Sequence, residues 1–266
     1  MNQIPFERKK LLLDLLVEGG SLRGISRATG HHRNTIVAAM HEASQGCAQM
    51  MDERFVGLGL KHLQVDEIWT FLGIKRDKLP KGETDSERGD QFLWTALDAE
   101  SKLIPAYYIG KRTNENALRF MHILRTRVSG SPQLSTDAFW GYRDAVDFSF
   151  GTQVDYAQVT KVYRTDWQAR HETYSPRAIA RVTTSIIRGN PDPKHVSTSF
   201  VERHNLTIRQ HLRRFARMSL GFSRKLECLA SAVTIFMWAY NFKKSHRTLH
   251  GATPAMAAGI VKGFLD

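Results

Sequence analysis

Cysteine is scarce in this 266-residue sequence, and its two cysteines, Cys47 and Cys228, lie far apart. Neither belongs to a C-x-x-C pair, so we expect no disulfide framework and no zinc. Long hydrophobic runs are also lacking. The most apolar stretch, residues 226–242, is too short and too interrupted by polar side chains to span a bilayer, so we expect a buried helix. No apolar segment follows the charged N-terminus, which predicts a cytoplasmic protein with no membrane partner.

Acidic residues are outnumbered, with 26 Asp and Glu against 38 Lys and Arg, which gives a net charge of +12. Such an excess indicates a polyanionic partner, most commonly nucleic acid. A ribosome-associated protein or a basic soluble enzyme has the same charge balance. Charge alone leaves these interpretations open.

Three helices are expected at the start of the chain, over residues 6–18, 22–28 and 33–43, with Ser21 as a helix N-cap and a tight turn at Thr29 and Gly30. Two short helices joined by a glycine-containing turn are typical of a helix-turn-helix domain. We assign residues 1–45 to this all-α domain. The glycine-containing residues 46–60 are interpreted as a linker.

An α/β domain is expected over residues 61–215. Strands are predicted within residues 63–74, 91–97, 103–109, 133–137 and 154–157, and residues 114–128 form an amphipathic helix pattern. Residues 75–90 are interpreted as a loop and residues 164–195 as turn-rich. Two long helices follow, over residues 199–215 and 223–244, and the C-terminal helical region is assigned to residues 216–266.

Three acidic residues have positions that suit metal-dependent chemistry. Asp66 lies within a strand pattern, Asp137 at the end of another, and Glu202 in the first turn of a helix. Carboxylates at strand ends and on a facing helix converge at one sheet edge, where they are able to hold two Mg²⁺ ions about 4 Å apart. Glu67 is a rival to Asp66, but strand alternation sends the two side chains to opposite faces, so we expect only one in the site.

Each acid also has a structural interpretation, because Asp137 suits a helix cap and Glu202 offsets a helix dipole. The helix around Glu202 favours function. At 100° per residue, Arg209 and Arg213 lie about 20° from Glu202 and Asn205 about 60° away. One stripe then carries a carboxylate, an amide and two guanidiniums, which suits a metal ligand followed by phosphate clamps. The alternative is a solvated charge face, against which Arg203, Arg214 and Arg217 add unpaired positive charge.

Five segments carry a family resemblance: HLQVDEIWTF (62–71), STDAFWGYRDAV (135–146), GNPDP (189–193), VERHNLTIRQHLRRF (201–215) and YNFKKSHRTLHGATPAMAAGI (240–260). They resemble the insertion-sequence-one-type bacterial transposases, a group within the DDE transposases and integrases. The resemblance implies an RNase H-like mixed-sheet core and a catalytic triad of Asp66, Asp137 and Glu202, with Arg209 as the basic residue seven positions on. It also implies Mg²⁺ or Mn²⁺, and hydrolysis at the element's 3′ ends followed by attack of the 3′-OH on target DNA.

Many relatives carry a four-cysteine zinc module, which this chain is unable to form. Recognition of the terminal inverted repeats then depends on the helix-turn-helix alone or on help from the C-terminal helices. At the start of its third helix, Arg33 suits guanine and Asn34 adenine, whereas Arg23 and Arg27 suit phosphates. A protein-docking module of three helices is the alternative. The expected DNA-contacting residues are Arg23, Arg27, Arg33, Asn34, Thr35, Asn205, Arg213, Arg214 and Arg217.

Trp140, just after Asp137, suits stacking on an unpaired base, but we favour a core anchor. The hypothesis for the whole chain is an active DNA transposase that works as a homodimer or larger assembly on double-stranded DNA at the nucleoid. A non-catalytic regulator descended from a transposase is the main alternative, and a nuclease without strand transfer is a third. A regulator is expected to lose one of the three acids, and all three are present.

Overall fold

The computed structural model describes residues 4–80, 88–163, 179–216 and 219–265. Three helices form the N-terminal part: α1 (Phe6–Val17), α2 (Leu22–Thr29) and α3 (Arg33–Arg54). The Ser21 hydroxyl accepts a hydrogen bond from the backbone N–H of Gly24, and Gly30 ends α2 at a φ of 73°. Both features confirm the predicted cap and turn. Leu12, Ile25 and Ile36 join the three helices in a small core of their own.

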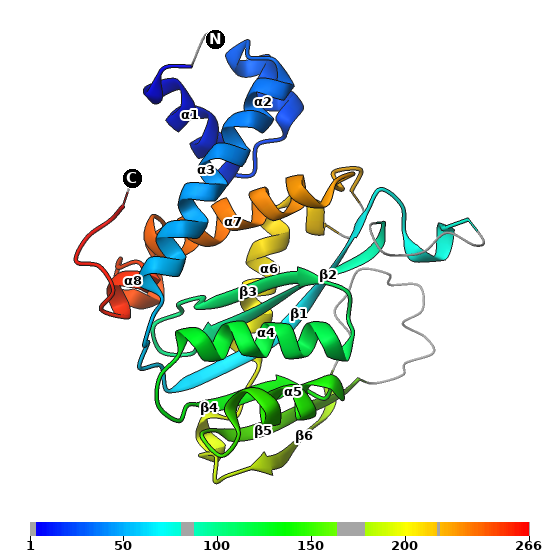
Figure 1. Ribbon diagram of the computed structural model, residues 1–266, viewed down its shortest axis with the longest axis vertical. Helices are drawn as coiled ribbons and strands as arrows, with labels where there is room; N and C mark the ends of the chain where they lie inside the picture. Colours follow the sequence, from blue (N-terminus) through cyan, green and yellow to red (C-terminus); the bar gives the residue numbers. More distant parts are fainter. Residues whose placement is uncertain (1–3, 81–87, 164–178, 217–218, 266) are drawn as a thin grey trace.

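Helix α3 is longer than the sequence predicted and runs without interruption through the first part of the expected linker (Figure 1). Gly46 lies on its exposed side, whereas Ser44, Cys47 and Met51 face inward at helical spacing. Packing against α7 (Leu226–Phe242) therefore outweighs the low helix propensity of one glycine. The linker interpretation is wrong for residues 46–54, and the N-terminal helices are joined to the rest of the chain by a continuous helix.

The central sheet has six strands in the order β3-β2-β1-β4-β5-β6. Strand β1 pairs in parallel with β4, which pairs in parallel with β5, and the other neighbours are antiparallel. This mixed sheet with helices on both faces is the α/β architecture that the sequence predicted. The strands are β1 (His62–Leu72), β2 (Gly89–Asp98), β3 (Ala106–Gly110), β4 (Gln133–Asp137), β5 (Asp155–Tyr163) and β6 (Ile179–Arg188).

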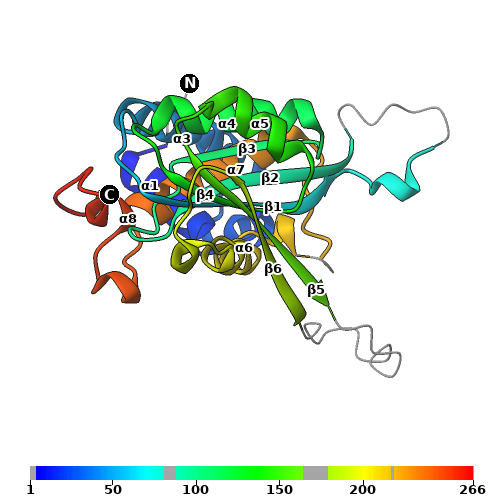
Figure 2. The same cartoon turned by 90° about the horizontal axis from the view of Figure 1, so that it is seen from below.

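Helices cover both faces of the sheet (Figure 2). On one face α4 (Asn114–Arg127) and α5 (Gly141–Phe150) bury a core that includes Val65 and Trp94. On the other face α6 (Ser199–His211) and α7 bury a core that includes Ile68 and Leu72. Odd-numbered residues of β1 thus face α4 and α5, and even-numbered ones face α6 and α7, as the two-residue period of a strand requires.

Two further elements differ from the sequence prediction. Strand β6 lies within residues expected to be turns, and its mostly exposed side chains gave no alternating hydrophobic pattern. Helix α6 ends at His211, and residues Arg213–Phe215 form a short 3₁₀ turn, η4. The carbonyl of Arg214 accepts a hydrogen bond from Thr70, and its guanidinium donates to Ser223, so η4 is held against β1 and not aligned with α6.

The remaining elements are short. They are the 3₁₀ turns η1 (Arg76–Lys78), η3 (Pro193–His195) and η5 (Arg247–Leu249) and the helix α8 (Pro254–Ala257). Met237 and Phe242 of α7 are fully buried, which confirms the predicted buried helix. Among the described residues, no helix is both long and apolar enough to cross a membrane.

Candidate active site

An open pocket of about 650 Å³ lies where β1, β4, β5 and α6 meet, and all three predicted acids line it. Asp66 comes from the middle of β1, Asp137 from the last position of β4, and Glu202 from the first turn of α6. The structure therefore brings together side chains that are far apart in the sequence. Asn205 and Arg209 of α6 line the same pocket.

Strand pairing places two of the carboxylates side by side. Val65 lies opposite Thr136 in the parallel pairing of β1 with β4, so Asp66 and Asp137 are the next neighbours. Asp66 faces α6, where its Oδ2 accepts a hydrogen bond of 2.8 Å from Asn205 Nδ2. Asp137 Oδ1 accepts a bond of 2.9 Å from the backbone N–H of Phe139. This contact holds the Asp137 side chain in place. The N-cap residue of α5 is Trp140 and not Asp137, and the Trp140 side chain makes no capping hydrogen bond.

Glu202 is positioned through the start of α6. The buried Gln64 of β1 accepts hydrogen bonds from the backbone N–H groups of Phe200 and Val201, at 2.8 and 3.2 Å. These are two of the donors that the first turn of a helix leaves unpaired, so Gln64 attaches this turn to the sheet. Glu202 accepts a hydrogen bond of 2.6 Å from the Thr198 hydroxyl and forms an ion pair with Lys161 of β5.

Glu67 also belongs to the pocket, which corrects the expectation that only one of the two neighbouring acids joins it. One ligand oxygen each from Asp66, Glu67 and Asp137 lies within 4.8 Å of the others. Glu67 does point to the opposite face, where it accepts bonds from Arg112 Nε at 2.6 Å and the Tyr142 hydroxyl at 2.9 Å. Because β4 ends at Asp137, no strand separates the two faces beyond that point, and the longer side chain reaches the pocket.

The carboxylates raise one another's affinity for positive charge. Burial raises the pKa of Asp66 to about 8, and the charges of Glu67 and Asp137 add to the rise. Burial also raises the pKa of Glu67, and Asp137 adds to this while Arg112 opposes it. Both shifts favour a proton or another cation among these oxygens. The buried Asn205 Oδ1 beside them has no hydrogen-bond partner among the described residues, so this oxygen is available as a further ligand for a cation.

The predicted stripe on the Glu202 helix is present for one turn fewer than expected. Asn205 and Arg209 share the pocket with Glu202, but Arg213 does not line it. The reason is the end of α6 at His211, after which the chain turns into η4. Arg213 lies instead on a second cavity, together with Arg23 and Arg33 of the N-terminal helices.

Trp140 is not a core anchor. Its side chain is 65% exposed on the pocket rim, whereas its neighbour Phe139 is 9% exposed and packs against Trp94 and Tyr142. One aromatic residue suffices to anchor the end of β4, and the core takes the first of the two.

The other expected DNA-contacting residues are distributed over two parts of the chain. Arg27 and Asn34 are exposed on α2 and α3, Thr35 is half-buried, and Arg217 lies outside the described residues. Arg214 turns inward, where it donates to Ser223 Oγ at 2.7 Å. That bond assigns Arg214 a structural contact, in place of the exposed position expected for a phosphate clamp.

Sequence reasoning missed Arg112 and Lys161, which line the pocket, and Tyr142, which donates a hydrogen bond to Glu67. Arg112 donates to both Glu67 and Asp137, the latter at 3.0 Å from its Nη2. Lys161 is paired with Glu202, and Tyr142 is completely buried against Glu67. Only Tyr142 gave a signal, because it lies within the STDAFWGYRDAV segment. The partners of the other two lie on elements distant in sequence, because Arg112 contacts β1 and β4 and Lys161 of β5 contacts α6.

A separate group of metal-binding residue types lies between α3 and α7 and consists of His41, Glu227 and Cys228. His41 Nδ1 lies 2.7 Å from Ser231 Oγ, and its Nε2 lies 3.7 Å from Cys228 Sγ. Burial raises the pKa of the Cys228 thiol, which disfavours the thiolate that binds metal ions. These contacts connect the long N-terminal helix to α7.

Two comparisons with known proteins, by family model and by sequence, point to the same family. A family model described as IS1 transposase matches residues 190–243, which include all of α6 and α7. The insertion element iso-IS1n protein InsB of Shigella dysenteriae is 23% identical over 183 residues, which is 67% of this chain and 95% of that protein.

Solved structures are more distant. The piggyBac transposase synaptic complex with hairpin DNA aligns with 95% of this chain and 69% of that chain, at 8% identity and a TM-score of 0.37. The Mos1 transposase paired-end complex with the left transposon end aligns with 56% of this chain and 59% of that chain, at 13% identity and a TM-score of 0.21. TM-scores this low do not establish a shared fold. The family model and the curated relative support an IS1-type transposase, which confirms the resemblance predicted from the sequence motifs.

Proposed function

We propose that this chain is a DDE-type DNA transposase that binds the terminal inverted repeats of its element, hydrolyses their 3′ ends and joins them to target DNA. The observation that carries the proposal is the convergence of Asp66, Asp137 and Glu202 on one open pocket, with Asn205 and Arg209 beside them. Their positions on β1, β4 and α6 support an RNase H-like core, as do the strand order and the parallel pairing of β1, β4 and β5.

The pocket suits hard divalent cations. Its possible metal ligands are carboxylate oxygens and the Asn205 amide oxygen, which has no hydrogen-bond partner in the part of the chain that the structure describes. These are the ligand types that Mg²⁺ and Mn²⁺ prefer. Asp66, Asp137 and Glu202 would hold the ions, two in number as the family resemblance implies, with Asn205 orienting Asp66. Bound there, the ions would activate the attacking oxygen and stabilise the leaving one.

The remaining residues position the reacting groups. In the first step water attacks the scissile phosphate, the bond to the element's 3′ oxygen breaks, and a 3′-OH is left on the element. In the second step that hydroxyl attacks a target phosphodiester and displaces the target's own 3′ oxygen. Lys161 and Arg209 bring positive charge to the phosphate, and Arg112 orients Asp137. Trp140 offers an exposed ring for an unpaired base at the cut end.

The two-domain arrangement extends the proposal to end recognition. Residues 1–45 act as a helix-turn-helix, residues 61–215 as the catalytic domain and residues 216–266 as a C-terminal helical region. Helix α3 extends from the first domain to Arg54 and packs against α7, so we expect the DNA-reading helices to keep a fixed position relative to the pocket. Because two ends have to be held together for joining, we propose a homodimer or larger assembly on DNA.

Labelled terminal-repeat DNA tests this proposal directly. Incubation with Mg²⁺ is expected to release a free 3′-OH at the element's end, and incubation with EDTA is not. Scrambled DNA of equal length serves as the matched substrate. Cleavage that ignores the sequence of the end would favour a nonspecific nuclease over a transposase.

Arg209 offers a prediction that separates chemistry from binding. Its guanidinium is placed in the pocket to stabilise charge on the transferring phosphate, so Arg209→Ala is expected to lower turnover at saturating DNA by about 100-fold. Arg209→Lys should recover part of the loss, because an ammonium lacks the bidentate fork. Single-turnover rates at saturating protein measure this. If low salt or a high protein concentration restored the full rate of Arg209→Ala, Arg209 would only bind a phosphate and would have no role in the chemical step.

A further inference from the structure

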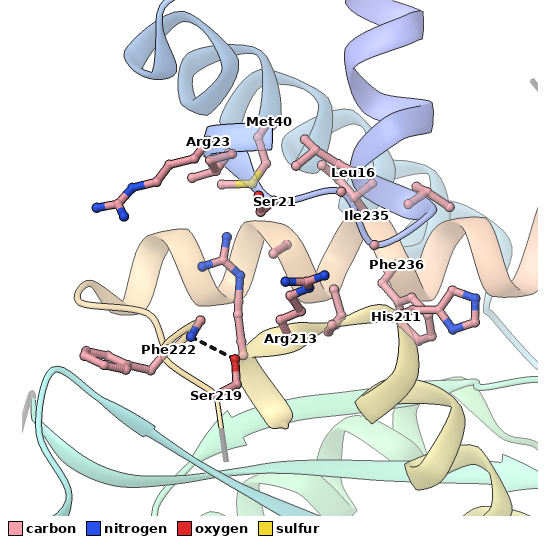
Figure 3. Close-up of a pocket in the computed structure, with 18 of the residues that line it drawn as sticks. Leu16, Ser21, Arg23, Met40, His211, Arg213, Ser219, Phe222, Ile235 and Phe236 are labelled. Atoms are coloured by element: carbon pink, nitrogen blue, oxygen red, sulfur yellow. Dashed lines mark hydrogen bonds between the residues drawn. The ribbon is translucent and has the colours of Figure 1, made fainter. Parts of the chain in front are cut away.

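A second cavity, of about 640 Å³, lies between the N-terminal helices and the segment that follows α6 (Figure 3). Arg23 of α2 and Arg33 of α3 line one side. Arg213 of η4 and Arg224, just before α7, line the other. Apolar side chains of α7, among them Ile235 and Phe236, form its floor. We call this space the interdomain cleft.

The interdomain cleft is strongly cationic. Arg23, Arg33, Arg213 and Arg224 are all exposed, and none of their side chains makes a hydrogen bond or ion pair with the rest of the described chain. No acidic residue is found among the described residues that line the cleft. Four guanidiniums gathered around one concave surface repel one another unless an anion lies between them, and arginine is the side chain best suited to phosphate.

Arg33 faces this cleft and not the outer surface of its helix. It precedes Val37 by four positions and Met40 by seven, and both of these pack in the core shared by α1, α3 and α7. Side chains at such spacings lie on one helical face. Asn34 is about 100° away around the helix, is exposed, and does not line the cleft. The structure thus separates two neighbours that the sequence grouped as base readers.

The cleft is also at a defined distance from the candidate active site. Glu202 lines the pocket of the carboxylates and His211 lines the interdomain cleft, and both belong to the single helix α6. Nine residues of α-helix span about 13 Å. Along a B-form duplex this length corresponds to roughly four base pairs, at about 3.4 Å per base pair on each strand.

We infer that the interdomain cleft holds the sugar–phosphate backbone of the element's own duplex, roughly four base pairs inside the cleavage site, and that Arg33 binds phosphate there. This inference depends on the proposed function, which supplies the DNA and the position of the cut. The cleft connects the reader and the catalytic pocket through one strand of backbone, so end recognition and cutting share a register set by α3 and α6. The floor of α7 packs against the sugar face, which carries no charge.

Ethylation interference on a labelled terminal repeat tests the position. Ethylation neutralises one phosphate at a time, and we expect it to weaken wild-type binding at phosphates about three to five positions inside the cut. Arg33→Ala combined with Arg213→Ala should lose this interference. Arg54→Ala is the matched control, because Arg54 is exposed at the far end of the same helix α3 and should keep it. Unchanged interference in the double variant would overturn the inference.

Salt titrations test the assignment of Arg33. Arg33→Ala and Arg213→Ala should each weaken binding about tenfold and flatten the slope of log K against log salt by about 0.9, equally on native and scrambled ends. Asn34→Ala should weaken binding to native ends only. Selective loss on native ends in Arg33→Ala would show base reading and overturn the inference. An acidic protein segment as the occupant would leave every DNA titration of these two arginine variants unchanged, which also overturns it.

Wild-type cleavage measured on the same DNA distinguishes failure of this inference from failure of the proposed function. Cleavage of native ends together with unchanged binding by the arginine variants contradicts the inference alone. A wild-type protein that neither prefers nor cuts native ends contradicts the proposed function as well.

Discussion

Neutral replacement of any one of the three acids is expected to abolish both cleavage and joining while leaving binding to the ends intact. Asp66→Asn, Asp137→Asn and Glu202→Gln each keep the size of the side chain but remove the negative charge that holds a divalent cation. We expect each rate to fall at least about 1000-fold, and to a similar level in all three, because residues acting as one unit are not additive. Cleavage and joining of labelled ends, with binding followed by gel shift, measure this.

Two control variants sharpen this test. Asp144→Asn changes an exposed acid of α5 outside the pocket and should leave the rate unchanged. Glu67→Gln is more informative, because both Glu67 oxygens already accept bonds from Arg112 and Tyr142. We expect it to act as a positioning residue, with a smaller loss of rate that higher Mg²⁺ concentrations partly restore. Substantial joining by Glu202→Gln would contradict the assignment of Glu202 as a metal ligand. Among the described residues, the only ion-pair partner of Glu202 is Lys161.

Metal-free protein should lose stability as the pH rises, and Mg²⁺ should restore it. In the folded chain the pKa of Asp66 is raised to about 8, against an ordinary value of 3.8. Between these values the folded state binds a proton that the unfolded state has released, so the free energy of unfolding falls from about pH 4 to about pH 8. Above pH 8 this loss is complete. A cation among the carboxylates takes the place of the proton and removes the loss.

Thermal unfolding of wild type and Asp66→Asn isolates the effect. In EDTA the wild-type Tm should drop by several degrees between pH 6 and pH 8.5 relative to that of Asp66→Asn, which has no proton to lose at this position. At pH 8.5, Mg²⁺ should raise the Tm of wild type more than that of the variant. Parallel pH profiles for the two proteins would mean that Asp66 is not buried against the other carboxylates as described.

Local patterns in the sequence were sufficient for much of the fold. Ser21 and Gly30 marked the ends of α2, and the apolar residues of α7 marked a buried helix. The extension of α3 past Gly46 was not predictable, because it depends on packing against α7, some 180 residues away in the chain. Strand β6 was missed for a related reason. Its exposed side chains show no alternation, and only pairing with β5 makes it a strand.

The candidate site divides in the same way. Asp66, Asp137 and Glu202 were found because strand ends and a helix start suggested one sheet edge, and the family segments agreed. Glu67 was excluded because strand side chains alternate between faces, and Glu67 does point to the face opposite Asp66. It still reaches the pocket, because β4 ends at Asp137 and no longer separates the two faces there. Arg213 was misplaced because the helical stripe was extended past the end of α6. Both errors concern where an element ends.

The measurement that tests the central claim most directly is a joining reaction. Wild-type protein, Mg²⁺ and DNA carrying the element's terminal repeats are incubated with a supercoiled plasmid, and products are scored for repeat ends joined to plasmid DNA through their 3′ oxygens. We predict joined products with native ends, none with scrambled ends or EDTA, and none with Glu202→Gln. Native ends that are bound and never cut or joined by wild-type protein would contradict a catalytic transposase and favour a DNA-binding regulator.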